Sequence, residues 1–222
     1  MTWLPDGPVT LGRATGPHGE VLLRRRGEVE ELVVNGVFAM DSSETRTERE
    51  LARLAAGAAR VLVGGLGLGY TAAELLDGDV AALDVVELED CLVRWAGQGL
   101  TPTLGRVARD PRVRLWTADV GAVLAGRADQ PAGPWDAVLL DVDNGPDFLI
   151  HDANAALYAE PALRAAYARL APGGVLALWS QGRSPALLAA LTDLGGAVAE
   201  HAFAVRREGR DLEYVVYTVR EE

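Results

Sequence analysis

Short apolar runs alternate with stretches of helical spacing from residue 60 onward. Each run is long enough for one buried strand, and the stretches between them are long enough for helices. Continuous apolar strands that alternate with helices are typical of a parallel sheet covered on both faces, so the pattern predicts an α/β domain. The predicted strands are 61–63, 82–86, 113–116, 137–140 and 175–179.

The clearest helical face carries Leu163, Tyr167 and Leu170, and we expect this helix to stop at Pro172 and the two glycines after it. The end of the chain has a different pattern. Segments 197–205 and 212–219 flank a charged turn that contains Gly209, which predicts an antiparallel hairpin at the edge of the parallel sheet.

The first forty residues predict a small β-sheet. Residues 19–40 are extended in pattern, and Asn35-Gly36 beside β-branched residues is a hairpin signal. The arginine run 24–26 is interpreted as a solvated strand face, with a phosphate-binding patch as the alternative. A helix should follow on the spacing of four apolar residues, with capping residues at 41–44; these apolar positions are Leu51, Leu54, Ala55 and Ala58.

Composition narrows the classes of function. The 222 residues include 21 basic and 32 acidic side chains, so the formal net charge is −11, and 49% of residues are hydrophobic. This balance argues against disorder and against tight nucleic-acid binding. Cys91 is the single cysteine, and we interpret it as a small apolar filler in a reducing cytoplasm. We expect neither a signal peptide at residues 1–6 nor a membrane span.

The candidate chemistry begins after the first predicted parallel strand. Gly65, Gly67 and Gly69 lie between that strand and a helix, where glycine permits a sharp turn and a close approach by a ligand. Glu87 ends the next strand, 18 positions after Gly69, where a carboxylate could accept both hydroxyls of a ribose. Asp119 ends the third strand and could accept a hydrogen bond from an adenine amino group. The alternatives are a solvated Glu87 and an Asp119 that only caps a helix.

A nicotinamide dinucleotide and S-adenosylmethionine both fit this arrangement. The glycines alternate as G-x-G-x-G, whereas pyrophosphate-binding loops usually read G-x-G-x-x-G. The glycine spacing and the terminal hairpin favour S-adenosylmethionine.

Several further segments follow in a characteristic order: Asn35-Gly36-Val37, the glycine loop through Thr71 and Glu74, Val86-Glu87-Leu88-Glu89, Asp119, the run from Trp135 to Asp141, Leu170-Ala171-Pro172-Gly173-Gly174, and Gln181. On these segments the chain resembles the spermidine synthase family of aminopropyltransferases. The resemblance implies a Rossmann-like class I methyltransferase fold, with a mostly parallel seven-stranded sheet and a terminal antiparallel hairpin. It also implies a small N-terminal β domain over 1–44, before the main domain over 45–222.

The resemblance further implies a site for S-adenosylmethionine or decarboxylated S-adenosylmethionine. Gly65, Gly67, Gly69, Glu87 and Asp119 would bind this nucleoside. Relatives are commonly dimers or tetramers, and a homodimer is compatible with the sequence.

The chain departs from the family pattern at residues expected to bind the amine of the decarboxylated cofactor and the acceptor. Leu68 replaces the loop aspartate expected to bind the amine of the decarboxylated cofactor. The Tyr-His-Glu triplet that binds the acceptor reads Glu48-Arg49-Glu50, so only Glu50 persists, and Ala39 stands in place of a glutamine. The Asp-Ser-Ser-Asp loop reads Asp141-Val142-Asp143-Asn144. The resemblance places Glu50, Asn144 and Gln181 at the acceptor.

Asp141 and Asp143 are the candidate catalytic residues. They follow the fourth parallel strand, at the sheet edge where open α/β sheets bind ligands. Carboxylates there would attract an ammonium group, and one with a raised pKa could take its proton. The alternatives are a solvated acidic loop, a cation site that includes Asp152, and His151 as the base. We expect no metal.

Three hypotheses follow. The first is a transferase that uses S-adenosylmethionine or a close analogue on a small, amine-bearing acceptor. The second is a true aminopropyltransferase of polyamine synthesis. The retained Asp141, Glu50 and Gln181 favour it. The third is a nucleoside-binding protein that has lost turnover.

Overall fold

The computed structural model describes residues 7–128, 130–207 and 209–221, so the first six residues lie outside it. Its larger sheet has seven strands in the order β10-β11-β9-β8-β5-β6-β7. The strands from β9 to β7 are parallel, and β11 pairs antiparallel with both β9 and β10. The strands are β5 (Arg60–Gly64), β6 (Ala82–Glu87), β7 (Val113–Thr117), β8 (Trp135–Leu140), β9 (Leu170–Ser180), β10 (Ala197–Arg207) and β11 (Arg210–Arg220).

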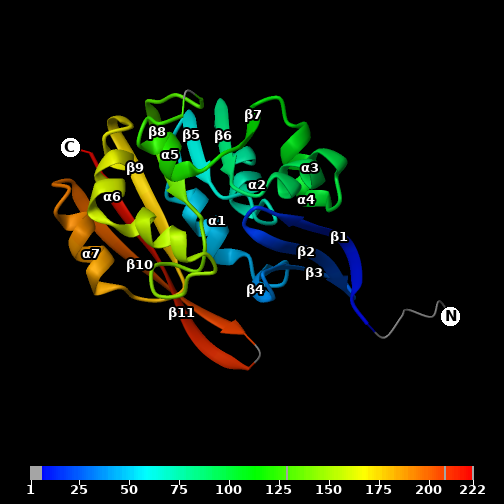
Figure 1. Cartoon of the computed structure of the whole chain (residues 1–222). Coiled ribbons are helices and arrows are strands. Elements are labelled where there is room, and N and C mark those ends of the chain that lie inside the picture. The colour runs from blue at the N-terminus through cyan, green and yellow to red at the C-terminus, as the bar shows by residue number, and fades with distance from the viewer. Residues whose placement is uncertain (1–6, 129, 208, 222) are drawn as a thin grey trace.

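Both faces of this sheet are buried, which explains the continuous apolar strands. On β5, Val61 and Val63 pack into one apolar cluster and Leu62 packs into the other, because successive side chains point to opposite faces. Helices cover both faces (Figure 1). They are α1 (Arg46–Arg53), α2 (Tyr70–Leu76), α3 (Asp90–Gln98) and α4 (Pro102–Arg109) on the first face, and α5 (Val120–Leu124), η1 (Asp152–Tyr158), α6 (Glu160–Tyr167) and α7 (Pro185–Thr192) on the second.

The smaller sheet is an antiparallel meander of four strands at the N-terminal end of the described chain. Asn35 and Gly36 form the turn between its last two strands with φ of 52° and 77°, as the Asn-Gly signal predicts. The sheet buries Leu23 and Leu32 against the first face of the main domain. The strands are β1 (Val9–Gly16), β2 (Gly19–Arg26), β3 (Val29–Val34) and β4 (Val37–Asp41).

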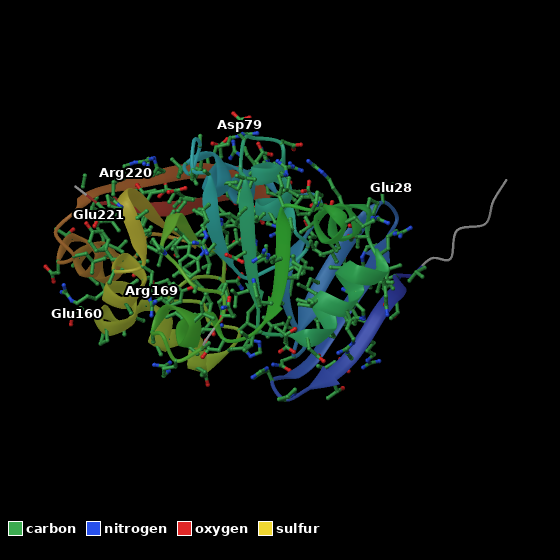
Figure 2. The ribbon with its side chains drawn as sticks, turned by 90° about the horizontal axis from the view of Figure 1, so that it is seen from above. Glu28, Asp79, Glu160, Arg169, Arg220 and Glu221 are labelled. Atoms are coloured by element: carbon green, nitrogen blue, oxygen red, sulfur yellow. The ribbon has the colours of Figure 1, made fainter. Side chains whose placement is uncertain are left out.

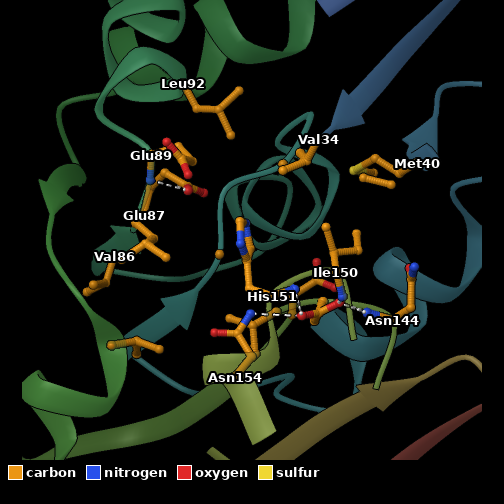
Figure 3. A pocket seen from close by; sticks show the side chains of 18 of the residues that line it. Val34, Met40, Val86, Glu87, Glu89, Leu92, Asn144, Ile150, His151 and Asn154 are labelled. Atoms are coloured by element: carbon orange, nitrogen blue, oxygen red, sulfur yellow. Dashed lines mark hydrogen bonds between the residues drawn. The ribbon is translucent and has the colours of Figure 1, made fainter. Parts of the chain in front are cut away.

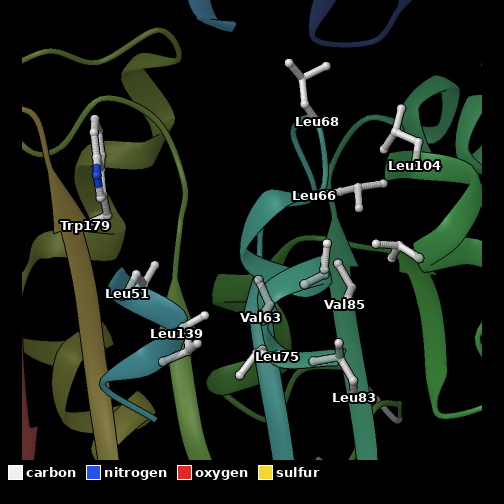
Figure 4. Close-up of a cluster of buried hydrophobic side chains, with 14 of the residues drawn as sticks. Leu51, Val63, Leu66, Leu68, Leu75, Leu83, Val85, Leu104, Leu139 and Trp179 are labelled. Carbon is white, nitrogen blue, oxygen red and sulfur yellow. The ribbon is translucent and has the colours of Figure 1, made fainter. Parts of the chain in front are cut away.

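The apolar cluster on the first face joins the two sheets (Figure 4). Leu51 from α1 and Trp179 from β9 lie in the same cluster as Leu66 and Leu68 from the glycine loop. Charged side chains such as Glu28, Asp79 and Glu160 are exposed at the periphery (Figure 2). The glycine loop is therefore packed into the core through its two leucines.

The α/β class, the five parallel strands and the terminal hairpin are confirmed. The predicted ends of two helices differ from the observed ones. Leu170 begins β9 and does not continue α6, which ends at Tyr167, and α1 ends at Arg53, before Ala58. β1 was not predicted, because its burial pattern is mostly exposed and irregular. In the described part of the chain, no helix is long and apolar enough to cross a membrane.

Candidate functional site

A pocket of about 160 Å³ opens at the carboxyl ends of β5, β6 and β8 (Figure 3). The central sheet contributes the glycine loop and the acidic residues that follow β6, β7 and β8. The smaller sheet contributes apolar side chains to the opposite wall, among them Val34 and Met40. The sheet edge at which the sequence placed the candidate residues is thus a pocket lined by both acidic and apolar side chains.

The glycine loop approaches the pocket closely. Gly65 has φ of +93°, and a Cβ there would lie 2.2 Å from the backbone oxygen of Asp141. A Cβ on Gly67 would lie 2.7 Å from Sδ of Met40. Both glycines line the pocket, whereas Gly69 begins α2 with φ of +87° and faces α4. Gly65 and Gly67 thus let the loop pack closely against Asp141 and Met40 at the pocket, where a side chain would overlap them.

Glu87 lies at the end of β6 and lines the pocket, but it also holds the glycine loop. One carboxylate oxygen accepts the N–H of Leu66 at 2.8 Å, and the other accepts the N–H of Glu89 at 2.8 Å. Burial raises the pKa of Glu87 above its ordinary value. The solvated alternative for Glu87 does not hold, since the residue is only 6% exposed.

Two further acidic residues lie at the same end of the pocket. Asp119 caps α5 by accepting the N–H of Gly121 at 2.8 Å, and it lines the pocket as well, so the two interpretations of this residue are compatible. Glu89 is buried, and its Oε1 has no hydrogen-bond partner. The nearest basic atom to it is Nδ1 of His18, at 3.5 Å.

Asp141 lies at the end of β8, and the structure pairs it with a residue that the sequence did not select, Glu48 on α1. Both line the pocket, and Oδ2 of Asp141 accepts the hydroxyl of Thr71 at 2.5 Å. The same hydroxyl lies 3.3 Å from the backbone oxygen of Glu48. Burial raises the pKa of Asp141 to about 6. Burial, and secondarily the negative charge of Asp141, raises the pKa of Glu48 to about 7.

Asp143 lines the pocket, yet its carboxylate is occupied by its own loop. It accepts N–H groups from Asn144, Ile150 and His151, and Nδ2 of Asn154 donates to it at 2.9 Å. A residue with φ of +59° and this many internal hydrogen bonds orders the loop after β8. Its geometry fits a positioning role better than proton transfer.

The structure does not bring all of the expected acceptor residues to the pocket. Glu50 points away and pairs with Arg53 at 2.7 Å, and Gln181 is absent from the lining among the described residues. Asn144 does line the pocket, and its carbonyl oxygen accepts the N–H of Gln181 at 3.1 Å. Gln181 therefore contacts the loop and not the cavity.

A signal for Glu48 existed in the sequence. The buried side of α1 carries Glu48, Leu51 and Ala52, at positions i, i+3 and i+4. Glu50 falls on the other side of the same helix. The family triplet directed attention to Glu50, whereas helical spacing from Leu51 would have selected Glu48.

No cluster of at least three histidine, cysteine or acidic side chains suited to a metal ion occurs among the described residues. His151 lines the pocket, and its ring is edge-on to that of His18, with centroids 6.3 Å apart. Cys91 is buried, and burial raises the pKa of its thiol to about 11, which fits the prediction of an apolar filler.

No protein-family model and no curated protein matches this chain. Solved structures do. A spermidine synthase in complex with the transition-state analogue AdoDATO matches with a TM-score of 0.79 at 15% identity, over 96% of this chain and 74% of that one. Spermidine synthase from Thermotoga maritima matches with a TM-score of 0.77 at 14% identity, over 96% and 73%.

A methyltransferase is also similar in structure. The N-methyltransferase NodS from Bradyrhizobium japonicum WM9, in complex with S-adenosyl-L-homocysteine, matches with a TM-score of 0.58 at 16% identity, over 80% of this chain and 87% of that one. At these identities the likeness concerns the fold. The chain therefore has the fold shared by spermidine synthases and S-adenosylmethionine-dependent methyltransferases.

Proposed function

We propose that this protein is a transferase that uses S-adenosylmethionine or a close analogue to alkylate a small, amine-bearing acceptor. The observation that carries the proposal is the acidic pair of Glu48, which is buried, and Asp141, which is half-buried. This pair shares a pocket with the glycine loop and with Glu87. An acidic pair in that position can receive an ammonium group and then its proton.

The residues present fit the nucleoside part of such a ligand. Gly65 and Gly67 line the pocket with backbone atoms alone, and Asp119 offers a carboxylate at the end of β7. Glu87 and Glu89 offer acceptors for ribose hydroxyls at the end of β6. The acids at this end of the pocket would select the sugar and the base.

The acidic pair would act on the acceptor. Asp141 or Glu48 takes the proton from the acceptor's ammonium, which leaves a neutral amine with a free electron pair. When bound, the sulfonium supplies an electrophilic carbon, so that the amine's electron pair forms the N–C bond while the C–S electrons leave on sulfur as a neutral thioether. Holding the reacting atoms in line supplies much of the acceleration.

Leu68 bears on which sulfonium is used. Its side chain is completely buried in the core, so the glycine loop presents no carboxylate to an aminopropyl amine. This favours S-adenosylmethionine. The likeness to spermidine synthases supports the second candidate, aminopropyl transfer from decarboxylated S-adenosylmethionine.

Calorimetric titration with both sulfonium compounds tests the proposal. We expect S-adenosylmethionine to bind at least as tightly as its decarboxylated form, and single-turnover assays with primary amines to yield S-adenosylhomocysteine. Binding of the decarboxylated form alone would favour aminopropyl transfer. Nucleoside binding without turnover on any primary amine would indicate a binding protein.

A further inference from the structure

The acidic pair of Glu48 and Asp141 has no basic side chain beside it in the described part of the chain. The two arginines that follow Glu48 on α1 are engaged elsewhere, since Arg49 and Arg53 each lie 2.8 Å from a carboxylate oxygen of Glu74. The side-chain charges that most affect the pKa of Glu48 are those of Asp141 and Glu44, and both are negative. When both carboxyl groups are ionised, a cationic group of a ligand can therefore balance their charge.

Apolar side chains line the same pocket. The smaller sheet contributes Leu32, Val34 and Met40, and the loop after β8 contributes Ile150. Trp179 from β9 brings a polar atom, its indole Nε1, which is buried without a hydrogen-bond partner. Indole N–H is a donor only, as is an ammonium group, so Nε1 of Trp179 accepts no hydrogen bond from a second cation.

The other acids of the pocket are engaged or lie at its nucleoside end. Asp143 is occupied by four donors of its own loop. Glu87, Glu89 and Asp119 follow β6 and β7, on the side of the proposed sugar and base. A second ammonium on the acceptor would therefore lie against apolar side chains without a counter-charge, and such burial is unfavourable.

We infer that the acceptor is a monoamine with an apolar body, held through its one ammonium group by Glu48 and Asp141, and not a diamine or polyamine. This inference rests on the proposed function, because it takes the nucleoside to occupy the end of the pocket at Glu87. It narrows the substrate class to primary or secondary amines whose remaining atoms match the wall of Leu32, Val34 and Met40.

The test compares two amines of equal length on the full chain loaded with S-adenosylhomocysteine. n-Butylamine and 1,4-diaminobutane are titrated calorimetrically at pH 8, where both are protonated. We expect n-butylamine to bind at least about tenfold more tightly, and Glu48→Gln to weaken its binding by a similar factor. Equal or tighter binding of the diamine to the unmodified chain would overturn the inference.

Ala39 provides a matched pair of variants. It lines the apolar side and is half-buried, so a slightly larger side chain can be accommodated. Ala39→Asp should raise the affinity for 1,4-diaminobutane, whereas the isosteric Ala39→Asn should not. Equal effects of the two would contradict the proposed acceptor position. Failure of S-adenosylhomocysteine to bind would instead overturn the proposed function, and failure of both amines to bind a loaded protein would overturn only the inference.

Discussion

Asp141 combines three features at one residue: a place at the end of a buried parallel strand, a hydrogen bond from Thr71, and a second carboxyl group nearby on α1. The raised pKa values of Asp141 and Glu48, about 6 and about 7, lie close to neutral pH. A base with a pKa near the working pH is the most effective one for proton transfer.

Replacing Asp141 by asparagine should abolish most of the transfer. We expect the turnover number to fall by roughly 10²–10⁴-fold, the usual loss when a general base is removed. The affinity for S-adenosylhomocysteine should remain nearly unchanged, because the proposed sugar contacts lie at Glu87. Single-turnover kinetics and calorimetry measure the two quantities, and unchanged turnover would contradict the assigned role. Glu87→Ala should show the opposite behaviour, with weakened nucleoside binding.

The acidic pair should also make stability depend on pH. The folded pKa values of about 6 and about 7 lie above the value near 4 for an unfolded carboxyl group. Between these values the folded chain binds more protons than the unfolded chain. The pair's contribution to the free energy of unfolding therefore falls as the pH rises from about 4 to about 7.

Glu48→Gln isolates this contribution from that of other carboxylates. We compare the free energy of unfolding of the variant with that of the unmodified chain at each pH. The difference should favour the variant more at pH 8 than at pH 5, because the variant lacks the repulsion between the two carboxylates. Urea unfolding at the two pH values measures the difference. A difference between the two proteins that does not change with pH would contradict the coupling.

At the scale of elements, the loop between β5 and α2 depends on glycine for two separable reasons. Gly65 needs a positive φ, and it also has a carbonyl oxygen where a side chain would be. Gly27, in the turn between β2 and β3, has φ of +59° and nothing within 4 Å of its Cβ position. The two positions therefore separate backbone strain from steric overlap.

Gly65→Ala should lower the free energy of unfolding by roughly 2–5 kcal/mol, the sum of left-handed strain and overpacking. Gly27→Ala should cost roughly 1–2 kcal/mol from strain alone. Denaturant unfolding gives both values, and nucleoside binding should be lost only in the Gly65 variant. Equal destabilisation of the two variants would contradict a steric cost from the backbone oxygen of Asp141.

Elements were predicted better than the site. The apolar runs identified all five parallel strands, because a strand buried on both faces has few polar positions. The resemblance directed attention to Glu50, but the direction of a side chain on α1 depends on which residues begin the helix. Likewise, the engagement of Asp143 by Ile150 and His151 depends on a loop conformation with a positive φ, which the sequence does not specify.

At the scale of the whole molecule, segments far apart in the sequence hold the smaller sheet in place. Arg207 at the end of β10 donates to Asp41 of β4 at 2.5 Å, across 166 positions, and its guanidinium lies 4.8 Å from the ring centre of Phe38. Both members of this ion pair are largely buried. Because β3 and β4 contribute Leu32, Val34 and Met40 to the pocket, this contact supports the part of the pocket proposed to bind the acceptor.

Arg207→Ala should therefore weaken amine binding by about fivefold, equivalent to about 1 kcal/mol, with little effect on the nucleoside. Arg206→Ala is the matched control, since Arg206 is exposed and lies 3.9 Å from Asp211. Titration of n-butylamine into each variant loaded with S-adenosylhomocysteine measures the effect. Equal affinities in the two variants would exclude long-range support by Arg207.

The strand order determines when, during synthesis, the contact between Arg207 and Asp41 can form. Among the described strands β10 pairs with β11 alone, and β11 lies between β10 and β9. Arg207 can therefore reach its final position only after β11 has entered the sheet. On the ribosome, the glycine loop and Asp141 emerge long before that moment, but the wall against which an acceptor would bind is not yet secured. The residues proposed to bind the nucleoside would thus be in place before the wall proposed to bind the amine.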